Sequence, residues 1–194
     1  PLVSASEPLP APVAIGVVSE RGEDVLYTLH ASAELRTVRV PVNTTAGEGS
    51  KRQQLSVLKQ QLPVSGPQLI PTARASAFAH DCRLLLLGCA WDCSLKIFRT
   101  AAPCKLLASV IYHRSAISCI GLSEREDVLV LGSRDTNVSQ WSLPPSVGAD
   151  GRPVESLSLG TPQQTYFEHA EEVTAVACNV DLDTVASASI DGTI

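Results

Sequence analysis

An aspartate recurs along this chain with the same neighbours each time, and this repetition limits the folds that are open to it. Asp92, Asp135 and Asp191 are separated by 43 and 56 residues. An apolar residue follows three positions after each of them, and an aromatic residue follows six positions after the first two, at Phe98 and Trp141. A chain that repeats one short pattern folds into equivalent units that pack against their neighbours.

The last two units match over a longer stretch. Shifting residues 113–138 by 56 positions places them on residues 169–194, so that His113 falls on His169. In both units the histidine precedes the aspartate by 22 residues. Repeats of about 40 to 45 residues built on such a turn are typical of β-propeller blades. The sequence therefore predicts an all-β fold, a partial propeller with about four blades of roughly seven.

The pattern divides the chain into blade-like units and inserts. We expect a degenerate blade over residues 1–42, a loop insert over 43–71, blades over 72–100 and 101–142, a second loop insert over 143–165 and a truncated blade over 166–194. The first insert carries leucines at helical spacing, but it is short and poorly capped, which favours a loop. Proline and glycine are frequent in the second insert, which predicts a surface loop.

Composition argues against several classes of protein. The net charge of -5 is unfavourable for a nucleic-acid binder, which needs a basic surface. No apolar run reaches the roughly 18 residues of a membrane span. The six cysteines form no C-x-x-C pair and lie near no histidine at zinc-ligand spacing, so we expect reduced thiols, no metal and no cofactor. The chain has no Met and its pattern stops at Ile194, so we expect a piece of a larger protein.

His113, Asp135 and Trp141 resemble the hydrogen-bonding set of WD repeats. In that family the histidine bonds the turn aspartate, and a Ser or Thr four residues before the aspartate links the histidine to the tryptophan. A charge-assisted hydrogen bond satisfies a buried His and Asp together. The linking position is Leu131 in the third unit and Gly88 in the second. We therefore expect His113 and Asp135 to pair without the link.

The other units contribute parts of the same set. The last unit has His169, Ser187 and Asp191, and the second has Asp92 without a histidine. We predict that all of these residues hold blades together. A catalytic triad is the alternative, but groups that recur in each repeat point to structure, and no G-x-S-x-G motif is present. We expect no enzyme and no catalytic residue.

The residue just before each turn aspartate is the candidate for partner binding. In WD-repeat proteins this residue tends to lie on the rim of the ring, and here it is Trp91, Arg134 or Ile190. Tryptophan and arginine are favoured anchors of protein interfaces. We predict that Trp91 and Arg134 contact a partner; packing of Trp91 against the next blade is the alternative.

Residues 72–194 resemble the propeller at the C-terminal end of BEACH-domain proteins, most of all the neurobeachin type. The likeness lies in Trp91-Asp92-Cys93-Ser94 and in the turn Leu131-Gly132-Ser133-Arg134-Asp135-Thr136. It implies a cytoplasmic scaffold of vesicle trafficking and membrane dynamics, peripheral on endomembranes through the parent protein, whose propeller docks other proteins. A generic WD-repeat adaptor, such as a substrate receptor of a ubiquitin ligase, is the first alternative. A propeller enzyme is a less favoured one.

Overall fold

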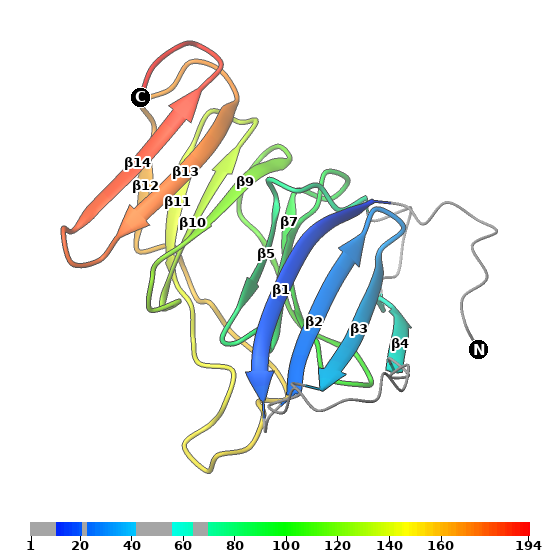
Figure 1. Cartoon of the computed structure of the whole chain (residues 1–194). Helices are drawn as coiled ribbons and strands as arrows, with labels where there is room; N and C mark the ends of the chain where they lie inside the picture. The colour runs from blue at the N-terminus through cyan, green and yellow to red at the C-terminus, as the bar shows by residue number, and fades with distance from the viewer. Residues whose placement is uncertain (1–10, 21–22, 42–55, 64–69) are drawn as a thin grey trace, which may run out of the picture.

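The computed structural model describes residues 11–20, 23–41, 56–63 and 70–194, and their strands form four antiparallel sheets (Figure 1). The first sheet contains β1 (Pro12–Glu20), β2 (Glu23–His30), β3 (Glu34–Pro41) and β4 (Ser56–Gln61). The second contains β5 (Ser76–Ala79), β6 (Leu84–Gly88), β7 (Ser94–Arg99) and β8 (Lys105–Ile111). The third contains β9 (Ile117–Leu122), β10 (Val128–Ser133), β11 (Val138–Ser142) and β12 (Gln164–Tyr166). The last pairs β13 (Val173–Asn179) with β14 (Thr184–Ser189).

The sheets stand side by side in chain order, as the blades of a propeller do. Within each sheet the strands pair in the order of the sequence, and the first strand of each sheet contacts the first strand of the next. Strands β1 and β13 point the same way in Figure 1, and β2 and β14 point the opposite way. The prediction of an all-β partial propeller is confirmed.

The outer strands of the first three sheets were not predicted as strands of those sheets. The sequence pattern predicted loop inserts or the next blade at these positions. Strand β4 falls in the predicted loop insert 43–71, whose residues 43–55 and 64–69 lie outside the described part. Strand β8 closes the second sheet, although its residues were assigned to the unit 101–142. Strand β12 closes the third sheet and begins inside the predicted insert 143–165. An edge strand needs only one hydrogen-bonded neighbour, so its sequence carries a weak pattern.

Strand β6 explains how the sheets hold together. All five of its residues are buried. Leu84 and Leu86 belong to the cluster between the second and third sheets, whereas Leu85 and Leu87 belong to the cluster shared with the first sheet. A strand covered on both faces by neighbouring sheets needs apolar residues at every position. Each fully buried leucine contributes about 1.5–3 kcal/mol of hydrophobic stabilisation.

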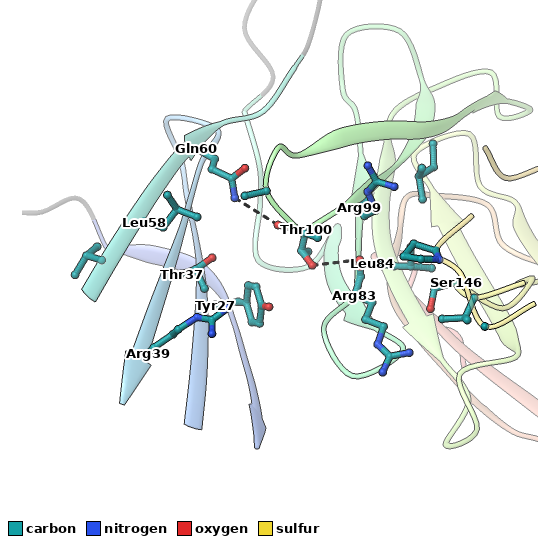
Figure 2. A pocket seen from close by; sticks show the side chains of 17 residues that line it. Tyr27, Thr37, Arg39, Leu58, Gln60, Arg83, Leu84, Arg99, Thr100 and Ser146 are labelled. Atoms are coloured by element: carbon teal, nitrogen blue, oxygen red, sulfur yellow. Dashed lines mark hydrogen bonds between the residues drawn. The ribbon is translucent and has the colours of Figure 1, made fainter. Parts of the chain in front are cut away.

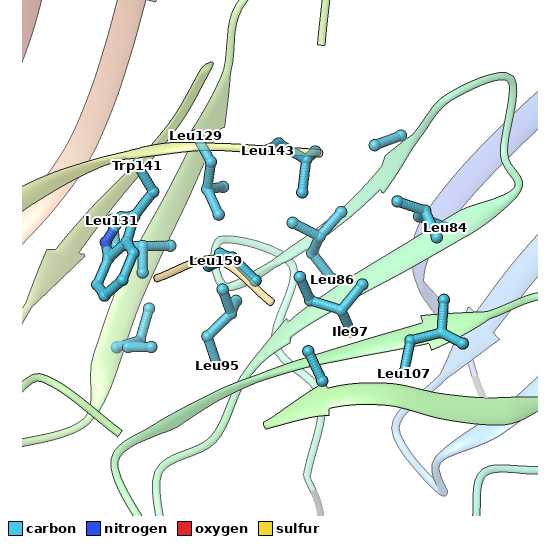
Figure 3. Close-up of a cluster of buried hydrophobic side chains, with 13 residues drawn as sticks. Leu84, Leu86, Leu95, Ile97, Leu107, Leu129, Leu131, Trp141, Leu143 and Leu159 are labelled. Atoms are coloured by element: carbon cyan, nitrogen blue, oxygen red, sulfur yellow. The ribbon is translucent and has the colours of Figure 1, made fainter. Parts of the chain in front are cut away.

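The cluster between the second and third sheets also draws on the second insert (Figure 3). Leu143 and Leu159 are 3% and 7% exposed and pack with Leu86, Ile97 and Trp141. The prediction of a surface loop over 143–165 is therefore wrong for both ends of that segment. The prolines and glycines of this segment form turns in its middle part. Its two ends are held in the core by leucines.

Two glycines allow adjacent sheets to approach closely. A Cβ atom on Gly88 would lie 2.8 Å from Cβ of Ile117 in the third sheet. A Cβ atom on Gly132 would lie 2.6 Å from Cγ1 of Val173 in the last sheet. These two contacts are equivalent in successive repeats. Gly88 is the last residue of β6 and Gly132 the last but one of β10, and Ile117 and Val173 each begin the first strand of the next sheet.

Candidate functional site

The turns that follow β2, β6, β10 and β14 form one end of the sheets, which we call the upper rim and which covers residues 31–33, 89–93, 134–137 and 190–193 (Figure 1). In three of these turns an aspartate carboxylate accepts a hydrogen bond from the backbone N–H two residues later. The pairs are Asp92 with Ser94 at 3.1 Å, Asp135 with Asn137 at 3.2 Å and Asp191 with Thr193 at 2.8 Å. The recurring aspartate therefore fixes the turn itself, as aspartates commonly do through their own backbone.

The residue after each aspartate takes a left-handed backbone conformation. Its φ angle is 54° at Cys93, 73° at Thr136 and 83° at Gly192, and Ala33 takes 58° at the matching place in the first sheet. Glycine adopts this conformation without strain, whereas a β-branched threonine does so at a cost. The turn geometry is thus kept in all four sheets even where the residue is poorly suited to it.

A chain of hydrogen bonds joins the third sheet to the loop that leads into it. His113 Nδ1 lies 3.1 Å from Asp135 Oδ2, and His113 Nε2 lies 2.7 Å from Ser139 Oγ. The indole N–H of Trp141 donates to the same Oγ at 2.9 Å. Because a carboxylate only accepts, His113 carries its proton on Nδ1 and its Nε2 accepts from the Ser139 hydroxyl. Every buried polar group in this series of hydrogen bonds, from Asp135 to Trp141, has a partner.

Electrostatics keep His113 neutral and Asp135 charged. Burial lowers the pKa of His113, and this outweighs the opposing attraction of Asp135. Burial alone would raise the pKa of Asp135, but hydrogen bonds from the N–H of Arg114 and Asn137 and from His113 hold that pKa below its usual value. The N–H of Arg114 is 2.7 Å from the carboxylate, so the aspartate also fastens the loop that leads into the sheet.

The prediction that His113 and Asp135 pair without a hydroxyl link is wrong. Leu131 does occupy the expected position on β10, but Ser139 stands directly opposite it on β11 and supplies the hydroxyl. In the last sheet the hydroxyl comes from Ser187 on β14, 2.8 Å from Nε2 of His169. The linking group is therefore contributed by either member of a cross-strand pair.

In the last sheet the histidine contacts its aspartate indirectly, through a threonine hydroxyl. His169 Nδ1 lies 2.6 Å from Oγ1 of Thr193 and 3.8 Å from Asp191. The Thr193 hydroxyl lies 2.6 Å from Asp191 Oδ1, and the N–H of Ala170 donates to Oδ2 at 2.7 Å. These hydrogen bonds, with that of Thr193 the largest contribution, hold the pKa of Asp191 below its usual value.

The second sheet replaces the histidine with a lysine that sequence reasoning missed. The ammonium of Lys96 contacts the carboxylate of Asp92 and lies 2.6 Å from Ser94 Oγ, and the residue is 7% exposed. Burial raises the pKa of Asp92, but the contacts with Lys96 and Ser94 outweigh it and the pKa lies below its usual value. The available signal was the spacing, because Lys96 follows its aspartate by four residues, as Ser139 follows Asp135.

Trp91 and Arg134 both lie on the upper rim with their side chains in solvent. The backbone bond that closes the turn runs from Cys89 to Ser94 in the second sheet but from Ser133 to Asn137 in the third, so the Trp91 turn is one residue longer. Trp91 is 74% exposed, which is incompatible with its packing against the next blade. Arg134 forms an ion pair with Glu172 at 3.2 Å while 60% of its side chain stays exposed.

Comparison with known families agrees with this geometry over the last repeat. Residues 160–194 match the WD40 family, described as WD domain, G-beta repeat. This segment is a WD40 repeat, and the four sheets together are a partial WD-repeat β-propeller. WD40 repeats are in general non-catalytic modules that bind other proteins. The six cysteines are free thiols.

Among the described residues, no group of three or more His, Cys, Asp and Glu side chains is placed to hold a metal ion. In the same part of the chain, no helix is long and apolar enough to cross a membrane.

Proposed function

We propose that this chain is the propeller of a BEACH-type scaffold that docks other proteins during vesicle trafficking and membrane dynamics. The scaffold acts in the cytoplasm and associates peripherally with endomembranes. The WD40 repeat supports docking of proteins in general. The BEACH-type assignment is supported by the turn sequences around Trp91 and Arg134.

The exposure of Trp91 is the observation that locates the docking surface on the upper rim. A tryptophan that is 74% exposed on a turn can bury a large area when a partner arrives. Tryptophan and arginine are the residues that most often dominate interface energies. The Asp92 and Asp135 hydrogen bonds fix the two turns in advance, so little conformational entropy is lost on binding.

The test is affinity purification of the full-length protein in wild-type form and as the variants Trp91→Ala and Arg134→Ala. We expect membrane-traffic proteins with the wild type and at least about tenfold less of them with either variant. Leu182→Ala is the matched control, because Leu182 is 73% exposed on the turn between β13 and β14, away from the upper rim.

Two results would count against the proposal. Recovery of cullin-adaptor subunits instead of membrane-traffic proteins would favour a ubiquitin-ligase receptor. Partners that bind Trp91→Ala as well as they bind wild type would remove the upper rim from the mechanism.

A further inference from the structure

A cavity of about 800 Å³ lies between the first and second sheets (Figure 2). Its walls come from β2, β3 and β4 on one side, from the start of β6 and the end of β7 on the other, and from residues 146–153 of the second insert. Strand β6 runs from Leu84 in the cavity wall to Gly88 beside the Trp91 turn, so the cavity lies at the end opposite to the upper rim. Sites for ligands commonly occupy about 300–1,000 Å³.

Three arginines line this space. Among the described residues that line it are Arg39, Arg83 and Arg99, and there is no Asp or Glu. Arg99 is held by Glu155 at 3.2 Å, and Arg39 lies 3.8 Å from Glu23. In the described part of the chain, Arg83 has no ion pair or hydrogen bond through its side chain, and Nε of Arg99 is buried without a hydrogen-bond partner. In a protein of net charge -5 this is a local positive region.

Apolar side chains line the cavity beside the arginines. Val57 and Leu58 on the edge strand β4 are each 47% exposed, and both line the cavity. Leu107 on β8 and Pro153 in the second insert line it from the other side. A ligand that covers these side chains gains from removing apolar surface from water. The cavity therefore suits a ligand that combines a carboxylate with an apolar group.

Hydrogen bonds between the two sheets hold the cavity open. The Gln60 amide donates to the carbonyl of Thr100 at 3.4 Å and accepts from the N–H of Cys104 at 2.8 Å. The Thr100 hydroxyl in turn donates to the carbonyl of Cys82 at 2.6 Å. These bonds tie β4 to the turn after β7, so the walls are in place before a ligand binds.

His80 fastens the segment of the second insert that closes the cavity. Its Nδ1 accepts from the N–H of Ser146 at 3.1 Å, and its Nε2–H donates to the carbonyl of Glu126 at 2.9 Å. Ser146 itself lines the cavity. A site whose walls are fixed on every side binds with little loss of conformational entropy.

We propose that this cavity binds a short acidic segment of a partner protein. A carboxylate of the segment pairs with Arg83 and Arg39, because guanidinium groups bind carboxylates through two parallel hydrogen bonds. A neighbouring apolar side chain of the segment lies against Val57 and Leu58. An extended segment of a few residues fits the volume. The inference rests on the proposed function as a protein scaffold but uses a surface opposite to Trp91.

The test begins with selection of displayed random heptapeptides on the full-length protein. We expect enrichment of sequences in which Asp or Glu adjoins a large apolar residue. Binding of a selected, fluorescein-labelled peptide is then measured by fluorescence anisotropy, and Arg83→Gln is expected to weaken it at least about tenfold. Arg125→Gln is the matched control, since Arg125 is equally exposed, pairs with Asp181 and does not line the cavity.

Leu58→Ser provides a second variant that changes no charge, and circular dichroism shows that each variant folds. Peptides without acidic enrichment, or peptides that bind Arg83→Gln and Leu58→Ser as well as wild type, would overturn the inference. Displacement of the peptide by succinate or inorganic phosphate at equal concentration would also overturn it, since the site would then take small anions. If the peptide fails to bind Trp91→Ala but still binds Arg83→Gln, the upper rim is its binding site and the cavity is not.

Discussion

Replacing Ser139 with alanine tests whether the hydrogen-bond chain of the third sheet stabilises the fold. The hydroxyl serves two buried groups, Nε2 of His113 at 2.7 Å and the indole N–H of Trp141 at 2.9 Å. Both side chains are about 1% exposed, so water does not replace the lost partner. Leaving a buried group unsatisfied costs about 1–3 kcal/mol, so two such groups lower the free energy of unfolding by about 2–6 kcal/mol.

Two comparisons make the magnitude specific. Ser187→Ala in the last sheet removes a hydrogen bond to His169 alone, at a partly buried site, and is expected to cost about 1 kcal/mol. Ser142→Ala lies on the same strand as Ser139, is exposed and is expected to cost less than about 0.5 kcal/mol. Ser139→Thr keeps a hydroxyl at the site and should retain most of the stability.

Urea unfolding gives the free energies, and NMR reports the bond itself. The chain has two tryptophans, so the spectrum shows two indole N–H signals, one from exposed Trp91 and one from buried Trp141. Because the Trp141 N–H is buried and hydrogen-bonded, we expect its signal to exchange slowly with solvent in wild type and fast in Ser139→Ala. The reasoning would be refuted if the Ser139→Ala variant is as stable as Ser142→Ala and its Trp141 indole proton still exchanges slowly with solvent.

Three further predictions follow from the same geometry. The lowered pKa of His113 means that the unfolded chain binds the proton more readily, so this stabilisation is complete above about pH 6.5 and is lost as pH falls through the folded pKa. An NMR titration should find the pKa of His113 below its ordinary value of about 6.5, and a pKa at or above that value would contradict the assignment. Thr136→Gly should raise the free energy of unfolding by about 1 kcal/mol, because φ is 73° at this position, and a loss of stability in urea would count against strain. Gly132→Ala should cost about 1–3 kcal/mol, because its Cβ would lie 2.5 Å from Cys119 Sγ and 2.6 Å from Val173 Cγ1; the same measurement finding no cost would show that the sheets can separate freely.

The inner three strands of each four-stranded sheet, and both strands of the last sheet, could be predicted because their signals are local. Leu84 to Leu87 are apolar at consecutive positions, and the aspartate turns recur at readable intervals. The outer strands could not be predicted, because their pairing depends on residues far away in the sequence. Strand β4 contains Lys59 and Gln60. Its place in the sheet is set by pairing with β3, not by an apolar pattern of its own.

The linking groups of the site were missed because they depend on which residues face each other across paired strands. Position counting from the aspartate pointed to Leu131 and Gly88, but the hydroxyl can come from the residue directly opposite. In the second sheet the turn is also one residue longer, so Leu87 is the structural counterpart of Leu131. Cross-strand pairing and turn length are set by the three-dimensional fold, and a single sequence states neither.

The leucines at both ends of the second insert have a consequence for how this chain can change during evolution. Leu143 and Leu159 lie in the main core, so insertions or deletions next to them would open it. The stretch between Val147 and Pro153 is closed by an isolated bridge and by a hydrogen bond from the N–H of Gly148 to the carbonyl of Arg152, and its tip is exposed. Length changes are therefore expected at this tip alone, where they would alter the cavity wall and leave the packing of the sheets intact.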